Sequence, residues 1–196
     1  MKTFQFKITL TYTDDPVVWR RLLVPEDISF DEFHMAIQAV FGWESGHMYQ
    51  FSAKGWGSKP YYQALGEWAE DDDDMRDSED YLISEVFKRA GQKYTYIYDF
   101  GDDWKHGILL EKTTGQPVFA PHCIGGEGAC PPEDCGGVYG YYRLVDIVNN
   151  PSHEEHEEMR EWMGIPEGGK WDVNAFNLEE TNARCARLVG DDDDDE

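Results

Sequence analysis

"YTYIYDFGDDWKHGILLEK", residues 94–112, is the stretch that decides the fold. Its large side chains recur at every second position on both sides of Gly101. Before the glycine, one face carries only aromatic rings: Tyr94, Tyr96, Tyr98 and Phe100. After it, one face carries mainly apolar groups: Trp104, His106, Ile108 and Leu110. A period of two residues is typical of a half-buried strand, and Asp102 and Asp103 beside a glycine favour a turn. The pattern predicts a β-hairpin whose tyrosines and Trp104 pack in a core.

Further strands and helices are indicated on both sides of this hairpin. Alternation predicts strands over residues 4–12, 17–25, 47–53, 93–100 and 104–112. Helices are predicted over residues 29–42, 82–91, 138–150, 152–164 and 177–189. Two of them begin with a capping box, Ser29 with Glu32 and Ser152 with Glu155. Residues 116–137 hold too much glycine and proline for regular structure.

This order of elements predicts an α+β fold, because the strands come mostly first and the helices gather at the end. We expect one domain over residues 1–190, with a mainly antiparallel sheet of about five strands and helices packed on one face. Residues 191–196, "DDDDDE", are expected to form a disordered acidic tail. The run "EDDDD" at residues 70–74 is expected to be solvated and mobile for the same reason.

The charge of the chain restricts its partners. It has 40 Asp and Glu against 17 Lys and Arg, a formal net charge of -23 at pH 7. Such a field repels phosphate backbones and acidic lipid surfaces, so nucleic acid is not an expected partner, whereas basic proteins and cations are favoured. No stretch approaches the roughly 20 apolar residues of a membrane span, and the first residues alternate instead of forming a secretory signal. We expect a cytoplasmic protein.

Two segments resemble catalytic motifs but lack residues that those motifs require. "DFG" at residues 99–101 lacks the glycine-rich loop, strand lysine and catalytic loop of a protein kinase. "HEEHE" at residues 153–157 differs from the zinc-protease HExxH, because Glu157 stands where the second histidine is required. An acidic first turn of a helix accounts for this segment.

The cysteines offer a metal-site hypothesis. Cys123, Cys130 and Cys135 lie within thirteen residues of one another, next to His122. Three thiolates on a loop can wrap one zinc ion, with His122 or a carboxylate as the fourth ligand. The spacing is wider than the usual C-x2-C knuckle, so a loop with partly buried thiols and no metal is the alternative. Cys185 falls on an apolar helical stripe and is expected in the core.

The histidine of the hairpin admits two interpretations. His106 lies on an apolar stripe, which favours a core histidine that packs and forms hydrogen bonds. The alternative is a carboxylate–histidine cluster that binds a metal or acts as acid and base. Its members would be Asp99, Asp102, His106 and Glu111, and His47 could join them.

The chain also resembles a known family. The segments "VVWRRLLVP", "FHMAIQAVFGWESGHMYQF", "YTYIYDFGDDWKHGILLEK" and "CIGGEGACPPEDCGGVYGYYRLVDIVNNPSHEEHEEMREWMG" occur in this order. Together they are similar to the plasmid pRiA4b open-reading-frame-three-like family over about residues 3–188. The resemblance implies a single α+β domain and, through the resolvase-like name of some members, an association with mobile elements. Recombinase chemistry is not expected, because DNA contact needs a positive surface.

These observations lead to one functional hypothesis and one alternative. The leading hypothesis is a non-catalytic module that binds a protein or small ligand carrying basic groups. Its expected surface combines aromatic, acidic and imidazole side chains, with the loop "PPEDCGG" (residues 131–137) nearby: Trp43, His47, Asp99, Asp102, Trp104 and His106. The alternative is a metal-dependent hydrolase, or a purely structural zinc on Cys123, Cys130, Cys135 and His122; zinc is the one cofactor considered.

Overall fold

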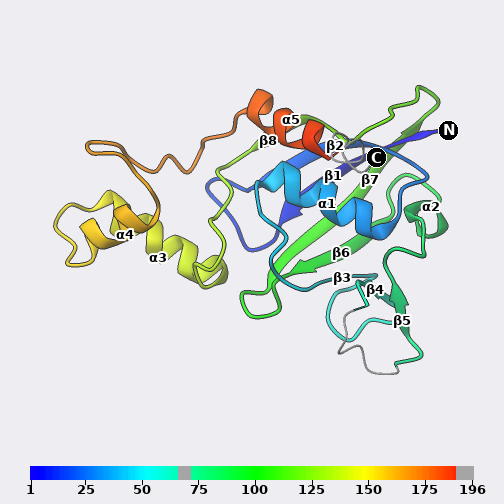
Figure 1. Ribbon diagram of the computed structural model, residues 1–196, viewed down its shortest axis with the longest axis horizontal. Helices are drawn as coiled ribbons and strands as arrows, with labels where there is room; N and C mark the ends of the chain where they lie inside the picture. The colour runs from blue at the N-terminus through cyan, green and yellow to red at the C-terminus, as the bar shows by residue number, and fades with distance from the viewer. Residues whose placement is uncertain (66–71, 189–196) are drawn as a thin grey trace, which may run out of the picture.

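An eight-stranded sheet forms the centre of the molecule (Figure 1). The computed structural model describes residues 1–65 and 72–188, so the predicted acidic tail and part of the "EDDDD" run lie outside the described residues. The strands are β1 (Thr3–Leu10), β2 (Trp19–Pro25), β3 (Tyr49–Ser52), β4 (Tyr61–Gln63), β5 (Met75–Asp77), β6 (Lys93–Tyr98), β7 (Trp104–Thr114) and β8 (His122–Glu127). The helices are α1 (Phe30–Phe41), α2 (Ile83–Val86), α3 (Gly137–Asn149), α4 (His156–Trp162) and α5 (Leu178–Arg187).

The sheet has the strand order β5-β4-β3-β6-β7-β1-β2-β8. The α+β class is confirmed, but the sheet has eight strands in place of about five. It is also mixed, because β4 and β5 run parallel while the other pairs are antiparallel. The predicted hairpin is confirmed as β6 and β7, with Tyr96 opposite His106 and Tyr98 opposite Trp104.

The core lies between one face of the sheet and helix α1. Phe6 of β1 packs against Phe33 of α1 with ring centroids 4.9 Å apart, and Phe51 of β3 lies 4.7 Å from Tyr96 of β6. Helix α5 lies beside α1, whereas α3 and α4 extend away from the sheet (Figure 1). The opposite face of the sheet is half-buried and polar, with an ion pair of 2.7 Å between Arg21 and Glu111.

Both ends of α1 are fixed as its sequence predicts. The Ser29 hydroxyl accepts a hydrogen bond from the Glu32 amide, and the Glu32 carboxylate accepts one from the Ser29 amide. Gly42 ends the helix with φ of +87°, a conformation that glycine adopts at no steric cost. The last carbonyls of the helix then accept from two arginines, Arg20 at Val40 and Arg184 at Ala39. A cation at a helix C-terminus is favoured by the helix dipole.

Three predicted elements are corrected by the structure. The segment expected to be irregular contains β8, which gains its hydrogen bonds by pairing with β2. The helix predicted over residues 82–91 is a single turn, because the chain turns to extended backbone at Phe87. The capping box Ser152–Glu155 is wrong: α4 begins at His156, because Asn150 accepts the Ser152 amide and Glu155 pairs with Arg143 at 2.8 Å.

The described part of the acidic run forms contacts with neighbouring side chains, while its carboxylates stay partly exposed to solvent as expected. Lys59 lies 2.7 Å from Asp74 and 3.8 Å from Asp72, and the Tyr61 hydroxyl donates to Asp72. This turn leads into β5 at the edge of the sheet. Among the residues described, no helix is both long and apolar enough to cross a membrane.

Candidate functional site

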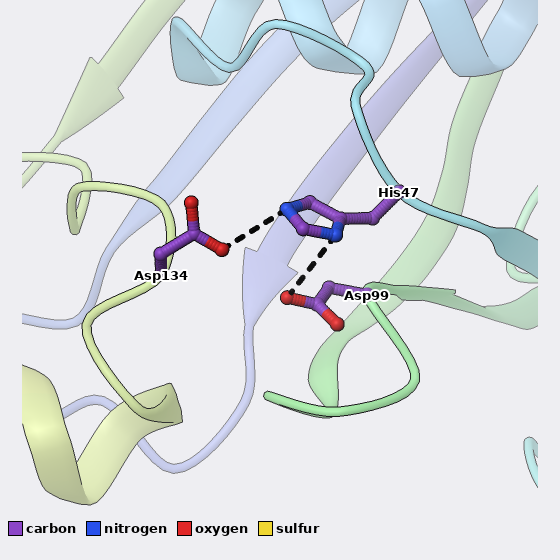
Figure 2. Close-up of side chains that lie close together, drawn as sticks. All are labelled: His47, Asp99 and Asp134. Atoms are coloured by element: carbon purple, nitrogen blue, oxygen red, sulfur yellow. Dashed lines mark ion pairs between the residues drawn. The ribbon is translucent and has the colours of Figure 1, made fainter.

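Three loops meet at one imidazole. His47 comes from the segment between α1 and β3, Asp99 from the turn between β6 and β7, and Asp134 from the loop before α3 (Figure 2). His47 Nδ1 lies 3.8 Å from Asp99 Oδ2, and His47 Nε2 lies 3.2 Å from Asp134 Oδ1. We call these three residues the His47 cluster. Asp134 is largely exposed and Asp99 is nearly buried, so the cluster opens to solvent on the Asp134 side.

The backbone around the cluster is held in an unusual conformation. Asp99 and Asp134 have φ of +53° and +59°, in the left-handed region that L residues other than Asn and Asp rarely adopt. Asp99 Oδ1 accepts from the amides of Gly101 at 2.8 Å and Asp102 at 3.3 Å, which closes an Asx-type turn. Because Oδ1 is engaged with the backbone, Oδ2 is the oxygen that faces His47.

The loop that carries Asp134 is fastened at several points. Trp43 Nε1 donates to the Pro131 carbonyl at 2.9 Å, and the Gly136 amide donates to Asp102 Oδ2 at 3.0 Å. Glu133 accepts from the amide of Glu44 at 2.9 Å and from the Tyr98 hydroxyl.

Burial, and secondly the nearby Glu133 carboxylate, raises the pKa of Tyr98, so its hydroxyl keeps the proton it donates. The loop is thereby fixed against both the turn between β6 and β7 and the segment before His47. The position of Asp134 is set by the fold.

The structure separates the predicted site residues into two groups. His47 and Asp99 come together, and Asp102 lies in the same turn, where it accepts the Gly136 amide. Trp43, Trp104 and His106 are 7%, 0% and 0% exposed. These three rings are therefore in the core and do not belong to an accessible aromatic surface, because the inward face of β7 is covered by α1 and the segment that follows it.

His106 does not join the carboxylates. Its Nδ1 donates to the Trp104 carbonyl at 2.9 Å, and its ring packs against Phe41, Trp43 and Tyr96. Burial lowers the pKa of His106 to about 3, so the ring is neutral at pH 7. His106 is therefore a core histidine, as the alternation of β7 favours, but its Nε2 is buried and has no hydrogen-bond partner among the described residues. Glu111, the other proposed member, lies on the opposite face of the sheet with Arg21.

The cysteine loop does not form the predicted zinc site. His122 and Cys123 are neighbours on β8, so they point to opposite sides; His122 is exposed and Cys123 is buried. Burial raises the pKa of Cys130 and of Cys135 to about 12, which keeps both as thiols. Within the part of the chain that the structure describes, only the His47 cluster brings three possible metal-ligand atoms within 4.8 Å of one another.

A serine–histidine pair that the sequence did not single out lies next to the cluster. His34 Nε2 is 2.6 Å from Ser45 Oγ, and His34 Nδ1 is 2.8 Å from the Tyr96 hydroxyl. Gln38 donates to that hydroxyl at 2.9 Å, which leaves His34 Nδ1 as the remaining partner for the Tyr96 proton and favours the tautomer with the imidazole proton on Nε2.

This arrangement makes His34 a donor toward Ser45, the reverse of the arrangement that activates a serine nucleophile. Burial also lowers the pKa of His34 to about 3. Gln38 accepts the Ser45 amide at 3.0 Å and completes a ring of hydrogen bonds. The pair thus locks the segment that presents His47.

Sequence reasoning named His47 and Asp99 and missed the role of Asp134. The only signal for it is its place in "PPEDCGG", the loop that the sequence predicts near the binding surface. Spacing along the chain cannot show that a loop 35 residues beyond Asp99 returns to the same imidazole.

Comparison with known proteins gives a consistent assignment. The family described as Plasmid pRiA4b ORF-3-like protein matches residues 2–180. The uncharacterized protein y4hQ of Sinorhizobium fredii (strain NBRC 101917 / NGR234) is 34% identical over 179 residues, which cover 91% of this chain and 88% of that protein. The crystal structure of the protein of unknown function MM3350 from Methanosarcina mazei Go1 is similar with a TM-score of 0.75 and 30% identity. It covers 91% of this chain and 97% of that one. The chain therefore belongs to the plasmid pRiA4b ORF-3-like protein family.

Proposed function

We propose that the chain is a non-catalytic binding module and that the His47 cluster is the centre of its binding surface. The observation that carries this proposal is the meeting of Asp99, Asp134 and His47 from three separate loops at a solvent-facing position. The ligand is a basic group, a lysine ammonium or an arginine guanidinium, on a protein or small molecule. The net charge of -23 favours the approach of such a partner and disfavours nucleic acid.

The donors of a basic group match the acceptors of the cluster. An ammonium group has three N–H donors. Asp99 and Asp134 each offer a carboxylate oxygen, and these two acceptors lie within 4.8 Å of one another beside the His47 ring. A charge-assisted hydrogen bond is roughly twice as strong as a neutral one, and the fastened loops reduce the entropy lost on binding.

The neighbourhood of the cluster supports binding over catalysis. The Ser45 hydroxyl is hydrogen-bonded by an imidazole that donates to it, and the pKa of His34 is too low for a general base near pH 7. The cysteines near the site are protonated thiols, since burial raises the pKa of Cys130 and Cys135.

A cytoplasmic location and an association with mobile elements are part of the proposal. The name of the family, with its reference to a plasmid, supports the second. The support for a cytoplasmic location is indirect: the acidic composition favours basic proteins as partners.

The proposal is tested with a fluorescein-labelled nine-residue peptide of alternating lysine and glycine, followed by fluorescence anisotropy. The double variant Asp99→Asn/Asp134→Asn is expected to weaken binding about tenfold or more, since the loss of two close charge partners costs about 1.4 kcal/mol or more. The matched control is Glu179→Gln/Glu180→Gln, which removes two charges from the exposed first turn of α5. Equal weakening in both double variants would show that only net charge matters and would contradict the proposal.

A divalent cation is the second candidate ligand, and with it the metal-dependent hydrolase. One observation favours it: three ligand atoms of the His47 cluster lie within 4.8 Å of one another, and one imidazole with two carboxylates is a common ligand set. Calorimetric titration of the dialysed protein with zinc and with manganese tests it.

A metal in the cluster predicts one binding event that His47→Ala abolishes and Cys130→Ala leaves unchanged. Loss of binding in Cys130→Ala alone would contradict a metal in the cluster. If neither metal gives a heat of binding and the lysine–glycine peptide binds, the basic group is the ligand of the cluster.

A further inference from the structure

Two recesses adjoin the His47 cluster on opposite sides. The first, of about 450 Å³, has His47 in its wall together with three apolar side chains, Met35, Met48 and Leu65. We call it the methionine recess. All three apolar side chains are substantially exposed, Met48 at 67%. Methionine is flexible and polarisable, and it adapts to apolar groups of varied shape.

The second recess, of about 240 Å³, lies between α3 and α4 and has Asp134 at its edge. Its apolar wall includes Leu144, Ile147, Met159 and Trp162. We call it the tryptophan recess. Trp162 is 50% exposed although its side chain is large and apolar. Arg143 and Glu155, which also line this recess, pair with each other at 2.8 Å, so Asp134 is the acidic residue here that lies outside their pair.

The His47 cluster contributes a residue to each of the two recesses. His47 lines the methionine recess, Asp134 lines the tryptophan recess, and the two side chains are 3.2 Å apart (Figure 2). A ligand that crosses the cluster therefore reaches apolar surface on both sides. An apolar groove that surrounds a few convergent polar groups is typical of a binding site.

We propose that the site takes an extended peptide segment of a partner protein in which a lysine or arginine has an apolar residue two positions away on each side; these apolar neighbours share its face, because adjacent side chains of an extended chain point to opposite sides. This inference rests on the proposed function. The basic side chain pairs with Asp99 and Asp134, one apolar neighbour enters the methionine recess, and the other, of leucine-to-tryptophan size, enters the tryptophan recess. Charge complementarity selects a peptide, because the segment must be basic to approach a chain of net charge -23 and apolar to fill both recesses.

The apolar residues are expected to supply much of the affinity. A fully buried leucine or phenylalanine side chain stabilises a complex more than an exposed ion pair does. The charges then fix the register of the peptide, and the recesses hold it. A peptide that is only basic should bind weakly.

The test begins with a displayed library of random twelve-residue peptides selected on the full chain. Enriched sequences are expected to share a basic residue with an apolar residue two positions away on each side. The tightest peptide is then synthesised with a fluorescent label, and its affinity is measured by anisotropy for Trp162→Ser and Met48→Ser. Each variant should weaken binding at least fivefold, since each removes an apolar wall from one recess.

The control is Phe119→Ser, which removes an apolar ring that is 83% exposed between β7 and β8 and lines neither recess. It should bind as the unmodified chain does. All substituted side chains are at least half exposed, so thermal unfolding of the variants is expected to remain close to that of the unmodified chain.

Four results would overturn the inference. One is an enriched set of peptides without apolar residues two positions from the basic residue, and another is unchanged affinity in both Trp162→Ser and Met48→Ser. Failure of the library to enrich any peptide is the third. The fourth is an apolar amine that binds as tightly as the peptide, which would show that the ligand is a small molecule. In each case the proposed function stands or falls separately, on whether Asp99→Asn/Asp134→Asn weakens binding of the lysine–glycine peptide.

Discussion

His106 makes the stability of the fold depend on pH in a way that a single substitution can isolate. The imidazole is fully buried, donates through Nδ1 to the Trp104 carbonyl, and has a pKa lowered by burial to about 3. An unfolded histidine titrates near pH 6.5. Below pH 6.5 the unfolded chain therefore binds a proton that the folded chain does not, and the free energy of unfolding falls as the pH falls. The effect develops between about pH 6.5 and pH 3.

The magnitude follows from these two pKa values. At pH 8 the histidine contributes almost nothing to the difference between the states. At pH 5 the unfolded state is favoured by about 2 kcal/mol, since linkage gives about 1.4 kcal/mol per pH unit below 6.5. His34 has its pKa lowered in the same direction, so it adds to the slope of the unmodified protein. The substitution His106→Phe isolates one of the two contributions.

The assay is urea unfolding followed by tryptophan fluorescence at pH 8 and pH 5. Relative to the unmodified chain, His106→Phe should become more stable by about 2 kcal/mol on going from pH 8 to pH 5, whatever its stability at pH 8. Effects of the many carboxylates cancel in this difference. His122→Gln, which removes an exposed imidazole from β8, controls for the loss of a histidine as such. A difference between His106→Phe and the unmodified chain that is the same at both pH values would refute the reasoning.

Two further predictions concern the supports of the site. Arg20 is buried and its guanidinium donates to four carbonyls, so Arg20→Lys should lower the free energy of unfolding by about 2 kcal/mol or more. Arg21→Lys, at the half-exposed pair with Glu111, should lower it by less than about 1 kcal/mol. Urea unfolding measures both changes. Gly137 and Gly164 both have positive φ, but an added Cβ at Gly137 would lie 2.5 Å from the Asp102 carbonyl oxygen and at Gly164 it would meet nothing within 4 Å. Gly164→Ala should therefore cost about 1–2 kcal/mol, and Gly137→Ala should cost more and also weaken peptide binding; equal costs would contradict the contact.

Alternation identified the centre of the fold because its strands are long enough to repeat. Residues 94–112 contain two strands with a clear inward face, and the structure buries Tyr96, Trp104 and His106 there. Strands β4 and β5 have three residues each and hold mostly polar side chains, so they carry no period to detect. Their parallel pairing depends on the path of the chain between them, which no local pattern encodes.

Strand β8 was missed for a different reason. Its sequence, His122–Glu127, contains two adjacent glycines in a segment rich in proline and glycine, and such composition favours loops. Its hydrogen bonds come from β2, with a shift of register between Arg21 and Leu22. Pairing with a partner strand outweighed the weak local preference. The same strand geometry separates His122 from Cys123 and removes the basis for the predicted zinc site.

The candidate site could be predicted only in part. His47 and Asp99 stood out as an imidazole and a carboxylate near turns, but their meeting depends on how three loops are fastened by the fold. The aromatic residues expected beside them, Trp43 and Trp104, are core residues instead. Trp43 donates a hydrogen bond to the Pro131 carbonyl in the loop that carries Asp134. The acidic composition predicts a basic group as the class of ligand. The structure shows which acidic residues lie close together, Asp99 and Asp134.

A titration followed by nuclear magnetic resonance tests the central claim most directly. The lysine–glycine peptide is added to the ¹⁵N-labelled chain, and the shift of every backbone amide is recorded. The account predicts that the largest changes lie on the three loops of the His47 cluster, at the amides of Gly46, His47, Gly101, Asp102 and Gly136. Changes concentrated at the acidic turn before β5 or on α5, with the three loops unaffected, would contradict it.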